Sequence, residues 1–169
     1  AVRAAVDVVR GGGCDQSTAG AVSITAAIVL AEAGEIEEAL AILDGVAAAC
    51  SGPMLGRVRL QQGLVLHHAG RLTESLSALD QSDRVFAQDG TDQERFRVHV
   101  NRGVVLLQQG QLDSAEVDFA AAAGLAQRLG MTAAEGQCHA NTGVLYGRAR
   151  RLVEALDAFD RAEVLLERA

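Results

Sequence analysis

One pattern recurs four times along the 169 residues, and it constrains the fold more than any other feature. Each copy has a turn residue, an aliphatic residue two positions later, a small residue at the fifth position and Leu or Phe at the ninth. The turn residues, spaced by 36, 40 and 40 positions, are Gly34, Gly70, Gly110 and Arg150. A period in this range predicts an array of small stacked units rather than one globular core. The function of such an array is expected to lie on its surface.

The apolar spacing inside each copy is helical. Over residues 35–49, apolar side chains recur every three or four positions, as one face of an α-helix requires. A second helix is predicted before each turn residue, over residues 19–33, 54–69, 92–109 and 132–149. Glycine at the turn ends the preceding helix in a left-handed conformation without steric cost. Together with a short helix over residues 1–10, the sequence predicts about nine helices in antiparallel pairs.

Several predicted helix starts carry capping signals. A hydroxyl residue followed three positions later by glutamate matches the capping box, in which both side chains satisfy free amides of the first turn. This pattern occurs at Thr91 and at Thr132. Ser51 followed by Pro53 predicts another start, with a polar cap and a proline in the first turn. Arg150 stands where the other copies have glycine, so a less tight turn is expected there.

The charge balance excludes two classes of partner. The chain has 15 basic and 22 acidic side chains, a formal net charge of −7. We therefore expect no contact with nucleic acid or a membrane surface, because both need a basic face for phosphate. No uncharged apolar run is long enough to span a bilayer, and Arg3 and Asp7 interrupt the N-terminal apolar stretch, so no signal peptide is predicted. All basic residues are arginine, which is typical of a high-GC bacterial genome.

Motifs for chemistry are absent from the sequence. Cys14, Cys50 and Cys138 are odd in number and irregularly spaced, which favours reduced thiols in a cytoplasmic protein over a disulfide framework or a zinc site. His67 and His68 are adjacent on a helix and point about a third of a turn apart, which is poor geometry for one ion. No nucleophile elbow, zinc-protease motif, phosphate loop or dinucleotide fingerprint is present. The sequence predicts no enzymatic activity, metal or cofactor.

The predicted first helices of the last three copies share a short motif. Gln or Asn stands two positions before a glycine and five before a large side chain, at Gln61, Asn101 and Asn141. With the turn glycine, the small residue at the fifth position and Leu or Phe at the ninth, this pattern resembles tetratricopeptide repeats over residues 17–168. The family's usual period is shorter and its closing proline is absent here. The chain is therefore most similar to the extended subtype seen in kinesin light chains and bacterial signalling regulators.

The resemblance implies an all-α fold, a right-handed α-solenoid of antiparallel helix pairs with a concave groove. It divides the chain into a remnant helix and loop of a preceding repeat, at residues 1–14, and four repeats that form one continuous domain. These repeats cover residues 17–50, 51–90, 91–130 and 131–169. By the family's geometry, the first helix of each pair lines the groove. The groove residues expected on this basis are Arg57, Leu60, Leu64, His67, His68, Arg97, Val100, Asn101, Val104, Gln108, Gln137, Asn141, Val144 and Arg148.

This groove is expected to be more basic than the chain as a whole, because it includes Arg57, Arg97 and Arg148. One hypothesis is that these arginines hold an acidic or carboxylate-terminated peptide, since guanidinium groups pair bidentately with carboxylates. The alternative is that they are solvated or paired internally on a surface that binds nothing specific. Asn101 and Asn141 are candidate clamps for a peptide backbone, but asparagine is common at this position of the family and a structural role is equally open.

Two functions follow from the predicted fold. The first is a protein–protein interaction module, a scaffold or sensor segment of a larger bacterial protein, that binds a peptide or a partner helix in its groove. The alternative is a structural array that self-associates through its terminal helices, because an uncapped repeat leaves apolar surface exposed. The resemblance also implies a further domain in the full-length protein, with a CHAT-type peptidase and a transcription regulator as the two candidates.

Overall fold

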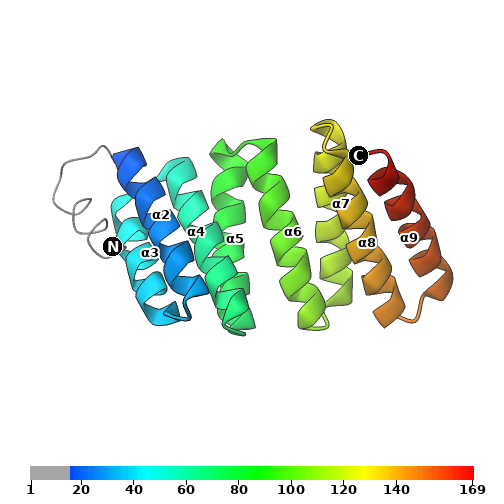
Figure 1. Cartoon of the computed structure of the whole chain (residues 1–169), viewed down its shortest axis with the longest axis horizontal. Helices are drawn as coiled ribbons and strands as arrows, with labels where there is room; N and C mark the ends of the chain where they lie inside the picture. The colour runs from blue at the N-terminus through cyan, green and yellow to red at the C-terminus, as the bar shows by residue number, and fades with distance from the viewer. Residues whose placement is uncertain (1–15) are drawn as a thin grey trace. The chain divides into compact units, whose positions relative to one another are not determined.

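The computed structural model describes residues 16–169, which form eight α-helices and no strand (Figure 1). The helices are α2 (Gln16–Glu32), α3 (Ile36–Ala49), α4 (Gly52–His68), α5 (Leu72–Asp89), α6 (Asp92–Gln108), α7 (Leu112–Arg128), α8 (Thr132–Arg148) and α9 (Leu152–Glu167). The prediction of an all-helical fold is confirmed for the described residues, and the first helix of each pair begins and ends within three residues of its predicted bounds. The predicted helix over residues 1–10, and Cys14, lie outside the described residues. None of the described helices is both long and apolar enough to cross a bilayer.

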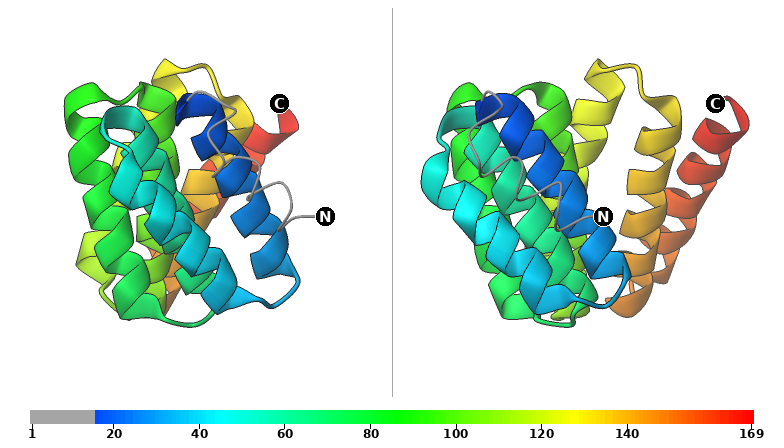
Figure 2. Two further views of the ribbon diagram at one scale, coloured as in Figure 1. Left: turned by 90° about the vertical axis from the view of Figure 1, so that its left-hand side faces the viewer. Right: turned by 60° about the vertical axis from the view of Figure 1, so that its left-hand side comes forward.

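The chain divides into two compact units, Ala1–Gly90 and Thr91–Ala169. In the first unit, α3 contacts α2 and α4, and α4 contacts α5. In the second unit, α7 contacts α6 and α8, and α8 contacts α9. Within each unit the helices alternate in direction (Figure 1), and the turned views of Figure 2 show this for α2 to α5. Each unit is therefore two helix pairs in which a second helix packs against the next first helix. That all four repeats form one continuous domain stays a prediction.

The helices of each pair are joined by the same hydrogen-bonded turn. At Gly70, with φ of 73°, the amide donates to His67 O at 2.9 Å, and the next amide donates to Leu66 O at 2.9 Å. These two bonds satisfy carbonyls that the helix end leaves free. Arg150 adopts the same conformation, with φ of 59°, and its amide donates to Gly147 O at 3.2 Å. The expectation of a less tight turn there is wrong, because the same hydrogen bonds hold the arginine in the left-handed region.

The capping predictions have mixed outcomes. At Thr91 both halves of the capping box are present, the threonine hydroxyl accepting from the amide of Glu94 and the Glu94 carboxylate accepting from the amide of Thr91. At Thr132 the prediction is wrong, because α8 already begins at this residue and Met131 occupies the cap position without a side-chain bond. Ser51 does precede the helix α4, but its hydroxyl makes no capping hydrogen bond. The turn that precedes each helix, more than the local motif, decides which residue becomes the cap.

Close packing within a pair depends on small residues of both helices. A Cβ atom added to Gly103 would lie 2.6 Å from the ring of Phe119, so only glycine allows α7 to approach this closely. Ser75 and Ser82 on α5 replace apolar residues of the pattern and are fully buried. Their hydroxyls donate to glycine carbonyls of α4 at 2.7 and 2.8 Å, which satisfies both groups in the core.

Candidate functional site

The groove residues predicted for the first unit all lie on α4. Arg57 and His68 are exposed, while Leu64 and His67 are half-buried. The rings of the two histidines lie 5.9 Å apart between centroids. Leu60 is only 2% exposed, which contradicts its assignment to the groove. It lies about one helical turn from Gly56 and from Gly63, the two glycines against which α5 packs. Leu60 therefore belongs to the core of the helix pair.

In the second unit, the predicted groove residues lie on α6 and α8, which contact each other. We call the surface that they form the first-helix face; it comprises Arg97, Val100, Asn101, Val104, Gln108, Gln137, Asn141, Val144 and Arg148. Val144 is 44% exposed, and the other two valines are half-buried. The arginines and the glutamines are exposed. Apart from the adjacent Val100 and Asn101, three or four positions separate neighbours along each helix, which places them on one side of it.

Two polar side chains of the first-helix face already have partners. Asn101 Nδ2 donates to the carbonyl of Arg97 at 2.7 Å, four residues earlier on the same helix. Arg148 Nη1 reaches from α8 to the carbonyl of Leu107 at 2.9 Å. This carbonyl also accepts from the amide of Gly110 at 3.2 Å, and it lies at the C-terminal end of α6, whose partial negative charge attracts a cation. Both side chains therefore have a structural role in the second unit.

A buried polar network that the sequence analysis missed connects α6 and α7. Asp118 is 3% exposed and accepts from Arg102 Nε and Nη2, both at 2.7 Å, and its Oδ1 lies 2.8 Å from His99 Nδ1. Burial by itself raises the pKa of Asp118, but the hydrogen bonds and charges of Arg102 and His99 together lower it below its usual range. The sequence did contain a signal for this network. When the four copies are aligned, Asp118 is the one charged residue at a position that is otherwise apolar, as Ile42, Ala78 and Ala158.

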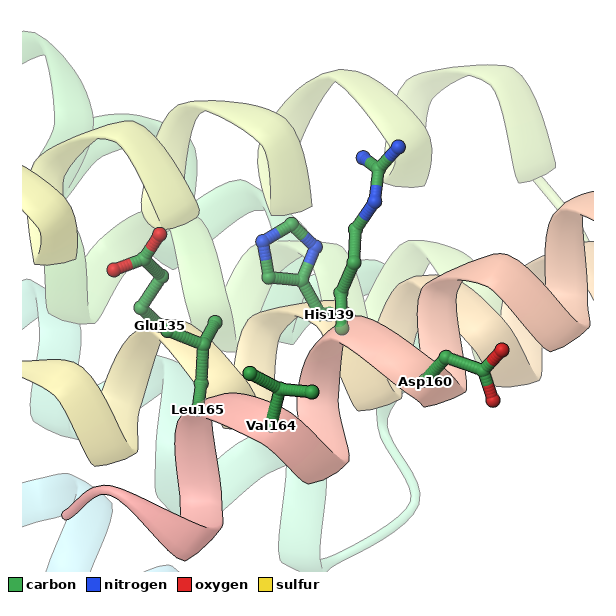
Figure 3. A pocket seen from close by; sticks show the side chains of 6 residues that line it. Glu135, His139, Asp160, Val164 and Leu165 are labelled. Carbon is green, nitrogen blue, oxygen red and sulfur yellow. The ribbon is translucent and has the colours of Figure 1, made fainter.

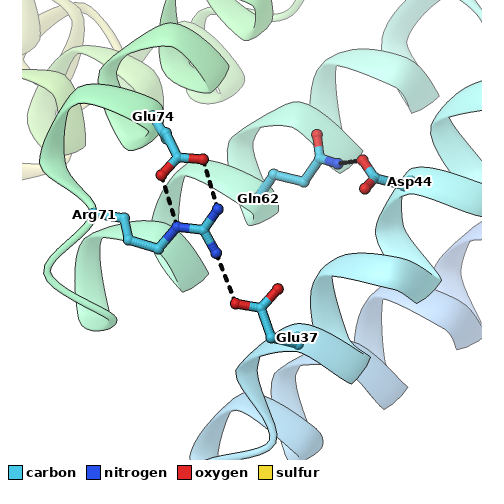
Figure 4. Close-up of polar contacts among 5 residues, drawn as sticks. All are labelled: Glu37, Asp44, Gln62, Arg71 and Glu74. Atoms are coloured by element: carbon cyan, nitrogen blue, oxygen red, sulfur yellow. Dashed lines mark hydrogen bonds and ion pairs between the residues drawn. The ribbon is translucent and has the colours of Figure 1, made fainter.

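An arginine directly after the turn ties neighbouring helix pairs together in each unit. Arg71 binds Glu74 of its own helix through two bonds of 2.7 and 2.6 Å, and Glu37 of α3 at 2.9 Å (Figure 4). Arg151 occupies the matching position in the second unit and binds Glu116 of α7 at 2.9 Å. These contacts are exposed, so their part is to orient neighbouring second helices more than to stabilise them.

Each unit has a hollow between its two second helices, floored by a first helix. In the first unit the hollow has a volume of about 270 Å³, and its polar groups bind one another. Arg59 donates to Gln62 Oε1 at 2.8 Å. Gln62 in turn donates to Asp44 Oδ1 at 2.7 Å, as Figure 4 shows. The corresponding hollow of the second unit, about 280 Å³, lies among α7, α8 and α9. Its floor consists of His139, Thr142 and Tyr146.

The second unit has another hollow, of about 400 Å³, between α8 and α9. His139 and Arg161 line both this hollow and the hollow of about 280 Å³. Figure 3 shows the imidazole of His139 between Glu135 and Asp160, with Val164 and Leu165 forming the apolar side. Burial lowers the pKa of His139; the charge of Glu135 acts in the opposite direction and that of Arg161 in the same one. His139 is therefore mainly neutral at pH 7, and both ring nitrogens remain available, one as donor and one as acceptor.

The thiol of Cys138 is buried on α8 and is not activated. Burial, together with the charge of Glu135, raises the pKa of Cys138 to about 11, so its thiol is protonated at neutral pH and is a poor nucleophile. Within the part of the chain that the structure describes, no three His, Cys, Asp or Glu side chains are placed to hold a metal ion.

Comparison with known proteins identifies the fold. No protein-family model matches the chain, and no curated protein matches its sequence. The crystal structure of BtubC (BKLC) from P. vanneervenii matches with a TM-score of 0.88 at 15% identity, over 99% of this chain and 72% of that one. MamA from residue 41 to its end, from Desulfovibrio magneticus RS-1, matches with a TM-score of 0.73 at 18% identity, over 99% and 86% of the two chains.

A third similar structure is YrrB, described as a TPR protein with an unusual peptide-binding site. It matches with a TM-score of 0.54 at 20% identity, over 98% of this chain and 93% of that one. Identities this low show a shared fold and no shared partner. The repeated helix pairs, the glycine contacts and these likenesses lead to one conclusion: the chain has the helical fold of tetratricopeptide-repeat proteins.

Proposed function

We propose that this chain is a protein–protein interaction module, and that the first-helix face of its second unit binds a peptide or a partner helix. The observation that carries the proposal is the composition of this face. Val100, Val104 and Val144 offer apolar contact between exposed arginine and amide side chains. Such a mixture provides both the buried area and the hydrogen bonds that peptide recognition needs. The peptide-binding site named for YrrB, a protein of the same fold, supports this choice.

The finer part of the proposal is that the peptide is acidic. Arg97 is exposed on α6. Arg148 uses Nη1 for the carbonyl of Leu107, and a guanidinium group has five N–H donors, so others remain for a carboxylate. In the first unit Arg57 and His68 are exposed at matching positions of α4 and are proposed to serve the same class of ligand. The amides of Gln137 and Asn141 are suited to a peptide backbone.

Titration with labelled acidic dodecapeptides, each paired with a version in which Asn and Gln replace Asp and Glu, tests this function. The acidic peptides are expected to bind in the micromolar range and to shift the amide signals of Val100 and Val144. The double variant Arg97→Ala, Arg148→Ala is expected to lose at least fivefold in affinity, whereas Arg128→Ala, an exposed cation of α7, is expected to change it less than twofold. Equal binding of the neutral peptides contradicts the acidic specificity. Binding by neither peptide set removes the peptide proposal itself.

A second candidate function, self-association through terminal helices, is favoured by the surface of α9. Six of the ten exposed large apolar side chains of the described residues lie on this helix. Leu156 is 64% exposed and Val153 is 70% exposed. Apolar patches of this kind mark contact surfaces. If this function holds, light scattering finds a mass that rises with concentration, and Val153→Gln with Leu156→Gln returns the chain to a monomer. A monomer at all concentrations rules it out.

The cellular setting is part of the proposal as well. We propose a cytoplasmic scaffold or sensor segment of a larger bacterial protein, which works without a cofactor and without contact to nucleic acid or membranes. The net charge of −7 supports the last point. A CHAT-type peptidase and a transcription regulator remain the two candidates for an attached domain, and the sequence of the full-length gene product distinguishes them.

A further inference from the structure

His139 occupies a position whose counterparts in the two preceding copies are both supplied with a carboxylate. In the third copy the counterpart is His99, which bonds to Asp118 at 2.8 Å. In the second copy it is Arg59, which bonds to Gln62, and Gln62 bonds in turn to Asp44. The first helix thus carries a nitrogen donor at this position in each of these copies. A carboxylate of the same chain pairs with this donor. The pairing is direct in the third copy and runs through the amide of Gln62 in the second.

In the fourth copy, the residues that would complete such a network are replaced by small ones. The positions of Arg102, Asp118 and Asp44 correspond to Thr142, Ala158 and Ala120. All three small residues line the hollow of about 280 Å³ together with His139. The hydroxyl of Thr142 donates to the carbonyl of Cys138 at 3.0 Å, so it does not take the place of the missing groups. The hollow therefore lies where the other copies hold their carboxylate partner.

We propose that this hollow binds an aspartate or glutamate side chain of a partner polypeptide, which hydrogen-bonds to His139 and pairs with Arg161. The bound carboxylate would take the place that Asp118 takes in the third copy. Arg161 lines the hollow from α9, and none of the described residues hydrogen-bonds or ion-pairs with its guanidinium. The apolar side of the site, with Phe119, Ala120 and Ala123 of α7, excludes water from the new bond and so strengthens it.

Acidic side chains outnumber the cations around the site, so the entry of an anion depends on Arg161 and on protonation of His139. Glu154 is neutralised by Arg151, which donates to it at 3.1 Å, and the Tyr146 hydroxyl donates to Glu116 at 2.6 Å. Asp157 lines the same hollow and has no ion-pair partner among the described residues. Glu135 and Asp160 line the adjoining hollow, on either side of the imidazole of His139 (Figure 3). A single carboxylate that enters beside His139 therefore meets one cation, Arg161, and one neutral donor, against three acids that have no ion pair among the described residues: Asp157, Glu135 and Asp160.

Binding at this site is coupled to protonation of His139. A carboxylate next to the ring favours imidazolium, so the pKa of His139, which burial lowers in the free protein, rises when the ligand binds. The complex then takes up a proton. Affinity is expected to increase as the pH falls from about 7.5 to about 6, while the ligand's own carboxylate stays ionised.

The site goes beyond the proposed function, because it lies on the opposite side of α8 from the first-helix face. At about 100° per residue, His139, Thr142 and Tyr146 point roughly half a turn away from Asn141 and Val144. A variant in one surface should leave the other intact. The two proposals can therefore fail separately.

A blocked pentapeptide with one central aspartate among alanines tests the site, with an asparagine pentapeptide as its control. Side-chain nitrogen signals of His139 are followed by NMR at millimolar peptide and between pH 5.5 and 8. We expect a saturable shift of these signals and a rise in the pKa of His139 with the aspartate peptide only. Equal shifts with the asparagine peptide, or no shift with either, overturn the proposal. A shift produced by a lysine peptide instead would assign the hollow to a cation and overturn it as well.

The double variant Ala158→Asp, Thr142→Arg supplies the network of the third copy and should close the site from within. Its affinity for the aspartate peptide is expected to fall at least tenfold, with net charge unchanged. Arg161→Gln, an exposed and conservative change, is expected to weaken binding several-fold and covers the case in which the double variant does not fold. The signals of Val144 should stay unchanged in both. Unaltered affinity in Arg161→Gln and in a folded double variant contradicts the assignment.

Discussion

At the scale of the residue, Arg150 is held in a backbone conformation that its side chain disfavours. Its φ of 59° lies in the left-handed region, and every other residue with positive φ among those described is glycine. A residue with a Cβ atom costs about 1 kcal/mol more than glycine there. The turn forms nonetheless, because the hydrogen bonds that end α8 require it.

Arg150→Gly is therefore expected to stabilise the second unit by about 1 kcal/mol, since it relieves this strain. The measurement is the free energy of unfolding in urea. Gly110→Arg, the reverse change at the matching turn, is the control and is expected to destabilise by a similar amount. If Arg150→Gly were neutral or destabilising, the side chain of Arg150 would have to contribute something that the turn geometry does not show.

Asp118 is the residue on which the polar network of the second unit depends. Its side chain is 4% exposed and that of Arg102 is 18% exposed, so removal of the carboxylate leaves a largely buried guanidinium without its partner. Asp118→Ala is expected to destabilise by about 3 kcal/mol. Glu37→Gln is the control, because Glu37 is 84% exposed in its ion pair with Arg71, and it should leave the urea midpoint almost unchanged. Similar losses in both variants would contradict this difference in burial.

At the scale of the helix, each pair depends on a glycine of its first helix against a large side chain of its second. Gly103→Ala places a methyl group 2.6 Å from the Phe119 ring and is expected to destabilise by about 2 kcal/mol. Gly147→Ala is the matched control: Gly147 is exposed, and an added Cβ meets nothing within 4 Å. It should be neutral or stabilise by up to about 1 kcal/mol, because alanine favours the helix. Thermal unfolding compares the two, and a stable Gly103→Ala would mean that α7 can move away from α6 at little cost.

The helices also show where sequence patterns were sufficient and where they were not. The turn glycines and the apolar spacing placed the first helices within three residues, because both act on the local backbone. The capping box at Thr132 was misleading, since the position of the helix start depends on the turn before it. Leu60 was misplaced because the facing side of a helix is set by the helix that packs on it. No local pattern carries that information.

At the scale of the whole molecule, stability is expected to fall in two steps as the pH decreases. Burial lowers the pKa of His139 in the folded chain, so below about pH 6.5 the unfolded chain binds more protons and stability declines. The pKa of Asp118 is also lowered in the folded chain, so its contribution is lost below about pH 4. Urea midpoints at pH 7.5, 5.5 and 3 measure both steps. His139→Gln should flatten the first step, and a first step that persists in this variant would assign it to another group.

The sequence by itself determined the repeated part of this protein. The positions that recur, such as the turn residues and the small residues between helices, act through local backbone conformation and through contacts that every copy shares. They were sufficient to predict helix pairs, their approximate bounds and the tetratricopeptide-like fold. A periodic signal of this kind is visible in the chain because the same physical requirement is met four times.

Only the tertiary structure decided how the positions that do not repeat are used. It paired Asp118 with His99 and Arg102, tied Arg148 to the end of α6, and left His139 beside a hollow at the positions where the other copies place Asp118 and Asp44. Each of these outcomes depends on a partner from another helix and on the direction of one side chain. The free energy of such pairs comes from burial and hydrogen-bond geometry, which exist only after the helices have packed.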